Sequence, residues 1–67
     1  MKKRYFEISI PRHGYYIYFK STIKGKPTKR EILTWAFDHK KITKEELPLA
    51  REIVEITKKQ YDDVMNS

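Results

Sequence analysis

Apolar and polar residues alternate along two neighbouring stretches near the N-terminus. The first is RYFEISI at residues 4–10, and the second is YYIYFKST at residues 15–22. A period of two predicts strands that each bury one face. The sequence PRHG between them contains a proline and a glycine, as tight turns often do. We therefore expect an antiparallel hairpin over residues 4–22.

The apolar face sets the register of this hairpin, because a slip of one residue would turn every apolar side chain to the other side. Pairing Ile10 with Tyr15 keeps the apolar residues of both strands on one face, which we expect to pack on helices. The other face should look out at solvent, with Tyr5 opposite Lys20, Glu7 opposite Tyr18, and Ser9 opposite Tyr16.

The second half of the chain has the pattern of helices. Thr28 followed by Glu31 is a capping box and predicts a helix over about residues 29–40. A second box, Thr43 with Glu46, and an apolar arc predict another helix over about residues 44–65, with a short turn ahead of Pro48. The expected fold is α+β: an N-terminal antiparallel β-hairpin packed on two C-terminal helices, in the order ββαα.

The chain of 67 residues is expected to form a single compact domain over residues 1–67 with a thin core. A third strand could complete the sheet at either edge of the hairpin, for instance from a second copy of the protein. The sequence alone leaves open whether it does.

Charge is distributed unevenly along the chain. Residues 1–30 hold nine Lys or Arg against one acid, Glu7, while residues 31–67 hold six against eight acids. The net charge of +6 therefore resides in the N-terminal half, where it suggests a basic surface that faces an anionic partner.

Several classes of function are disfavoured. The chain has no cysteine, and its two histidines, His13 and His39, are far apart in sequence, so we expect neither a metal site nor a cofactor. With no nucleophile beside a base and no phosphate-binding glycine loop, we expect no enzyme. No apolar run approaches the ~20 residues that span a bilayer, so we expect a cytoplasmic protein without a membrane partner.

Basic residues surround the predicted tyrosine face, and this combination is typical of nucleic-acid binding. Lysine and arginine displace counterions from phosphates, and tyrosine rings offer stacking surfaces for bases. We expect the hairpin face and the flanking loops to contact the backbone of DNA or RNA. The candidate residues are Lys3, Arg4, Tyr5, Arg12, His13, Tyr16, Tyr18, Lys20, Lys24, Lys26, Lys29 and Arg30.

The same features fit other interpretations. Tyrosine is a good strand former, and Tyr5 opposite Lys20 could be only a cation–π pair. A different function is a small adaptor or inhibitor, of the kind a phage or mobile element would encode. It would bind an acidic protein surface through the tyrosine face or an open strand edge. A homodimer through the C-terminal helix or the hairpin edge is a further alternative.

Overall fold

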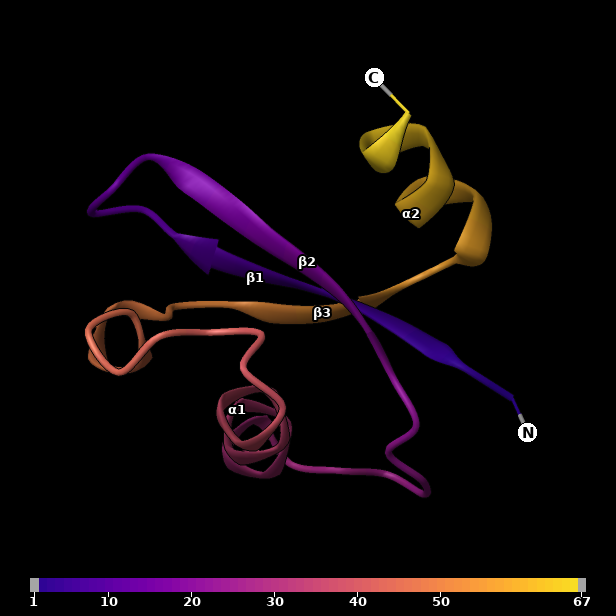
Figure 1. The fold of residues 1–67 in the computed structure, drawn as a ribbon, viewed down its shortest axis with the longest axis horizontal. Coiled ribbons are helices and arrows are strands. Elements are labelled where there is room, and N and C mark those ends of the chain that lie inside the picture. The colour runs from indigo at the N-terminus through magenta and orange to yellow at the C-terminus, as the bar shows by residue number, and fades with distance from the viewer. Residues whose placement is uncertain (1, 67) are drawn as a thin grey trace.

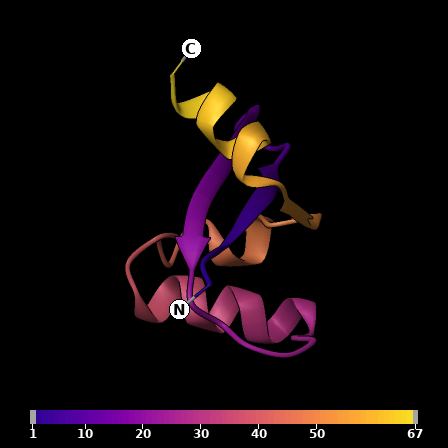
Figure 2. The ribbon, with the colours of Figure 1, turned by 90° about the vertical axis from the view of Figure 1, so that its right-hand side faces the viewer.

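The structure is a computed structural model that describes residues 2–66. Its elements, in chain order, are β1 (Arg4–Ile10), β2 (Tyr15–Ser21), α1 (Lys29–Asp38), a short 3-10 helix η1 (Leu47–Leu49), β3 (Ile53–Ile56) and α2 (Lys58–Met65). The α+β class predicted from the sequence is confirmed. Figures 1 and 2 show α1 and α2 on opposite sides of the sheet.

The sheet has the strand order β2-β1-β3, with both neighbouring pairs antiparallel. The predicted register of the hairpin is confirmed over its whole length, from Ile10 opposite Tyr15 to Arg4 opposite Ser21. The third strand comes from the chain itself, because Ile53 pairs with Ile8 and Ile56 pairs with Tyr5. The strand β1 is therefore central, and β2 and β3 form the two edges.

The core lies between the sheet and α1. The β1 residues Phe6, Ile8 and Ile10 are almost fully buried, as is Phe19 of β2, and all four lie on the face that the apolar alternation predicted. The helix α1 contributes its own buried residues to this core, and the loop after it adds another: Ile32, Ala36 and Ile42. Burial of large apolar side chains from both layers is the main favourable term for so short a chain.

The helix α1 begins as predicted. The Thr28 hydroxyl accepts a hydrogen bond from the Glu31 amide, and the Glu31 carboxylate accepts one from the Thr28 amide. The helix ends at Asp38, slightly before the predicted end at residue 40, and His39 caps it. Lys40 follows with φ of 59°, and this left-handed conformation turns the chain away from the helical path.

The predicted helix over residues 44–65 is wrong in its first part. The Thr43–Glu46 capping box is present, but it closes only a turn before η1. The chain is then extended over Ile53–Ile56, because these mostly β-branched residues fill the free edge of β1 and satisfy its backbone groups. The helix α2 starts only after a further capping box, formed by Thr57 and Gln60.

An ion pair fastens β3 to the start of β1. The Arg4 guanidinium donates two hydrogen bonds of 2.8 Å to the Glu55 carboxylate, and a third of 2.7 Å to the Gly25 carbonyl. Arg4 belongs to the same side of the sheet as Phe6, since alternate residues of a strand share a face. It therefore lies on the side opposite the tyrosines and is occupied by structural contacts.

We predict that the protein loses stability in acid. Hydrogen bonds lower the pKa of three carboxyl groups below its ordinary value: Glu55 through Arg4, Glu46 through the Tyr15 hydroxyl, and Glu31 through the Thr28 amide. The folded state then binds fewer protons than the unfolded state. The stabilisation is present above the unfolded pKa of about 4.3 and is lost as the pH falls through the lower folded values.

The midpoint of thermal unfolding, measured by circular dichroism, should be nearly constant from about pH 7 to pH 5 and should fall below about pH 4.5. The variant Glu55→Gln should unfold at a lower temperature near neutral pH, and its unfolding temperature should fall less on acidification than that of the wild type. An unfolding temperature that rises on acidification would contradict this prediction.

Candidate nucleic-acid interface

The outer face of the sheet, on the side away from α1, carries the predicted tyrosines. The Tyr16 side chain is 57% exposed, and its ring centroid lies 6.3 Å from that of Tyr18, which is half-buried. Both side chains lie on the outer face, as the alternation predicted. Two phenol rings on β2 are thus presented side by side at an edge of the sheet.

The helix α2 covers another part of this face. The Tyr61 ring packs on the Tyr5 ring, with 4.9 Å between their centroids, and the Lys20 ammonium lies 5.9 Å from the centre of the Tyr61 ring. The sequence predicts that Tyr5 lies open beside Lys20, and the structure differs. Instead, the Tyr61 ring lies against both. The helix α2 follows β3 directly and lies on the side of the sheet opposite α1 (Figure 1). The accessible part of the tyrosine face is therefore the part along β2.

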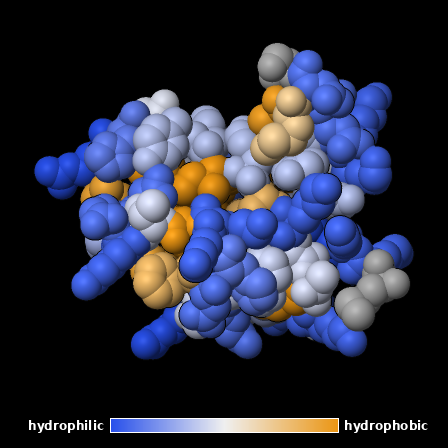
Figure 3. All heavy atoms as spheres, in the orientation of Figure 1, coloured by the Kyte–Doolittle hydropathy of each residue, from blue (hydrophilic) through white to orange (hydrophobic). Residues whose placement is uncertain are grey.

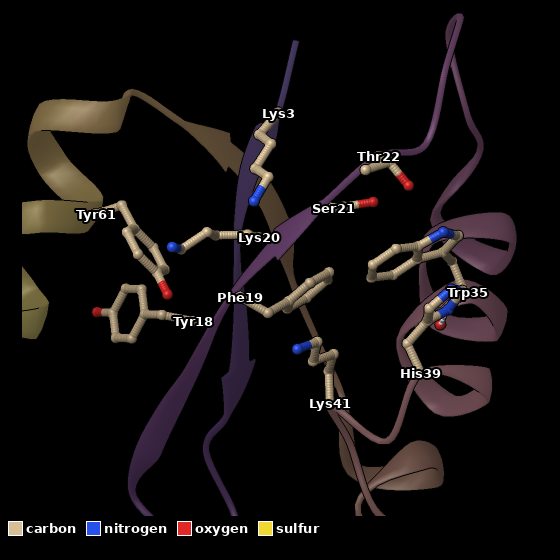
Figure 4. A pocket seen from close by; sticks show the side chains of 10 residues that line it. All are labelled: Lys3, Tyr18, Phe19, Lys20, Ser21, Thr22, Trp35, His39, Lys41 and Tyr61. Carbon is tan, nitrogen blue, oxygen red and sulfur yellow. Dashed lines mark hydrogen bonds between the residues drawn. The ribbon is translucent and has the colours of Figure 1, made fainter. Parts of the chain in front are cut away.

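A groove of about 510 Å³ runs around the edge of β2, between α2 and α1. We call it the β2 groove and define it by its lining: Lys3, Tyr18, Phe19, Lys20, Ser21, Thr22, Trp35, His39, Lys41 and Tyr61. In Figure 4, Tyr18, Lys20 and Tyr61 lie on one side of Phe19, and Trp35 and His39 of α1 lie on the other. The groove thus brings together side chains from the N-terminal segment, β2, α1, the following loop and α2.

Three aromatic rings form a continuous stack along the α1 side of the groove. Phe19 lies nearly parallel to Trp35 at 6.0 Å between centroids, and Trp35 lies nearly parallel to His39 at 3.8 Å. The His39 Nδ1 lies 2.8 Å from the Trp35 carbonyl oxygen and donates to it, since that oxygen only accepts. In the tautomer that carries its hydrogen on Nδ1, Nε2 is the acceptor nitrogen of the ring.

The β2 groove is electropositive. Lysines at positions 3, 20 and 41 enter its lining, and none of the lining residues that the structure describes is acidic. The acid beside it is Glu7, which lies next to Tyr18 on the outer face. Partial burial, followed by a hydrogen bond to Glu7, raises the pKa of Tyr18 above its ordinary value. These charges suit an anion that also has flat apolar surfaces.

The remaining predicted residues lie at two other places. Lys24, Lys26, Lys29 and Arg30 are exposed on the loop after β2 and the start of α1. A hollow of about 470 Å³, lined by residues that include Lys2, Lys3 and Lys24, joins this loop to the N-terminal segment.

Arg12 and His13 occupy the hairpin turn, where both are exposed. The His13 ring stacks on Tyr15 at 5.7 Å. At about 3.3 Å per strand residue, this turn lies roughly 20 Å from the loop at the other end of β2. The predicted residues therefore do not form one cluster.

Seven of the ten groove residues were not among the sequence candidates: Phe19, Ser21, Thr22, Trp35, His39, Lys41 and Tyr61. Trp35 and Tyr61 have the positions of core residues in their helical patterns, and each is in fact only half-buried. Lys41 follows directly on His39 and Lys40, and this small basic run at the end of a helix was the available signal.

No family model matches the chain, and neither the curated proteins nor the solved structures gave a match to it. Across residues 2–66 there is no cluster of three or more His, Asp or Glu side chains placed to hold a metal ion. None of the helices in that range is long and apolar enough to cross a bilayer.

Proposed function

We propose that this protein binds nucleic acid, without catalysing a reaction, through the β2 groove and the tyrosines beside it. The observation that carries the proposal is the combination in one groove of three lysines with aromatic rings, and the absence of acids among its described lining residues. Lysines displace counterions from phosphates, and aromatic rings stack on bases of any sequence. The basic loop with Lys24 and Lys26 extends the positive surface beyond one end of β2.

Binding should depend strongly on salt. If the three groove lysines and two loop lysines each neutralise one phosphate, the slope of log K against log salt is about −3.5 for a single strand and about −4.5 for a duplex. Affinity should then fall by about a hundredfold to five hundredfold between 50 and 200 mM salt. Fluorescence anisotropy with labelled oligonucleotides measures this directly. The absence of binding at low salt, or binding indifferent to salt, would refute the proposal.

A second candidate function is binding to a protein partner, including a second copy of the chain. It is favoured by the exposure of Val54 on the outer edge strand β3 and of Met65 on α2, which are 47% and 49% exposed. Figure 3 shows hydrophobic residues, in orange, at the surface among the hydrophilic ones. An edge strand with apolar neighbours is a common place for strand addition. Light scattering on the purified protein distinguishes a dimer from a monomer. The salt dependence of the binding constant distinguishes a protein partner from a ligand bound through its phosphates.

A further inference from the structure

We propose that the ligand is a single strand of nucleic acid, with bases stacked on the β2 tyrosines and one nucleotide held in the β2 groove. This inference rests on the proposed function and names the class of nucleic acid. It follows from three observations: the hairpin is enclosed by other elements, its exposed rings are spaced for separated bases, and the groove has the size and lining for one nucleotide.

The hairpin cannot read a duplex as a two-stranded ribbon. A ribbon enters the major groove, which is about 12 Å wide, only if its edges and one face are free. Here β3 occupies the second edge of β1, and α1 and α2 lie on opposite sides of the sheet (Figures 1 and 2). The Tyr61 ring of α2 packs on Tyr5 on the side away from α1. The hairpin is therefore part of a covered three-stranded sheet and presents no free two-stranded ribbon to the groove.

The two tyrosine rings on the outer face of β2 suit bases that are not stacked on one another. The Tyr16 and Tyr18 centroids are 6.3 Å apart, which is nearly twice the rise of about 3.4 Å between stacked bases in a duplex strand. Neighbouring bases that occupy both rings must therefore separate. A single strand separates its bases at little cost, whereas a duplex would have to break its pairs as well.

The β2 groove has the properties expected of a nucleotide site. Its volume of about 510 Å³ lies in the range of small-molecule pockets, roughly 300–1,000 Å³. Aromatic rings stand on both of its sides, with Tyr61 on one and Trp35 on the other, and the lysines reach it from separate segments (Figure 4). A base enters such a site only from a strand whose bases are free to turn outward.

The test measures the binding of three labelled or competing polymers to the wild-type protein at about 150 mM salt. The probes are oligothymidine of about 20 nucleotides, the same strand annealed to oligoadenine, and inorganic polyphosphate as a polyanion without bases. We expect the single strand to bind at least about tenfold more tightly than the duplex. We also expect the single strand to displace polyphosphate from the protein. The single strand should quench the fluorescence of Trp35, whereas the duplex should leave that fluorescence nearly unchanged.

The outcomes separate this inference from the proposed function. Duplex binding as tight as single-strand binding, with a steep salt dependence, would overturn the single-strand inference and leave nucleic-acid binding standing. Equal binding of polyphosphate and oligothymidine would also overturn it, because the rings would then contribute nothing. Failure of all three probes to bind at low salt would refute both proposals. Oligouridine in place of oligothymidine shows whether the strand is preferred as RNA.

Discussion

Replacing the three groove lysines with glutamine, as Lys3→Gln, Lys20→Gln and Lys41→Gln together, should reduce single-strand binding by about 500-fold at 50 mM salt. The side chains line the β2 groove from separate segments, so each is expected to contact a different phosphate, either that of the nucleotide in the groove or that of a neighbour along the strand. Removing three contacts should make the salt slope less negative by about 2. The loss should then shrink to about 30-fold at 200 mM, because these contacts contribute less as salt rises.

A matched control makes this a test of position rather than of net charge. The variant with Lys44→Gln, Arg51→Gln and Lys59→Gln removes the same charge from three exposed residues outside the groove. Anisotropy titrations at both salt concentrations should give this control a slope close to that of the wild type. Equal losses in both triple variants would mean that net charge, rather than the β2 groove, attracts the ligand. Both variants should retain the unfolding temperature of the wild type within a few degrees, since exposed charges contribute little to stability.

The hairpin could be predicted to the residue because its determinants are local. Alternation specifies which face of each strand is buried, and the PRHG turn holds the two strands together, so only one register buries both apolar faces. The start of α1 was equally predictable, since Thr28 and Glu31 form the capping box within four residues of each other. These features need no knowledge of where the rest of the chain goes.

The C-terminal half could not be predicted in the same way, because its conformation depends on a distant strand. Ile53 and Ile56 fall on the apolar arc of a helical wheel, yet they are also β-branched and suit a strand. The free edge of β1 decides between the two, and β1 lies more than 40 residues earlier in the chain. The same non-local pairing places α2 over the sheet, and so it also decides which tyrosines stay open.

The chemical character of the candidate site could be predicted from the sequence, but several of the residues that line it could not. Basic residues and tyrosines on β2 were identified from charge and alternation. Lys41 and Tyr61 join the site only because the turn after α1 and the path after β3 bring them to the edge of β2. Arg4 has the charge of a phosphate-binding residue, but its parity with Phe6 places it on the other face of the sheet.

The double variant Tyr16→Ala with Tyr18→Ala should lose single-strand binding by about 30-fold or more, up to about 25,000-fold, while it remains folded. Stacking of a base on an aromatic ring contributes about 1–3 kcal/mol by alanine substitution, and two rings are removed. Tyr16 is largely exposed, and Tyr18 is only half-buried, whereas the core beneath them consists of Phe6, Ile8 and Phe19. The cost in unfolding free energy should therefore be small beside the loss of binding.

Two control variants show whether the rings act by stacking. Tyr16→Phe with Tyr18→Phe keeps both rings and removes only the hydroxyls, so it should retain most of the affinity. Tyr15→Ala removes a tyrosine that is 42% exposed on the same strand but belongs to the other face, where its hydroxyl bonds to Glu46. It should lower the unfolding temperature and leave binding nearly unchanged, because the lost contact holds the turn before η1. If the double alanine variant binds like the wild type, the tyrosine face has no part in recognition; if it unfolds, these side chains hold the sheet together, and the surface must be sought elsewhere.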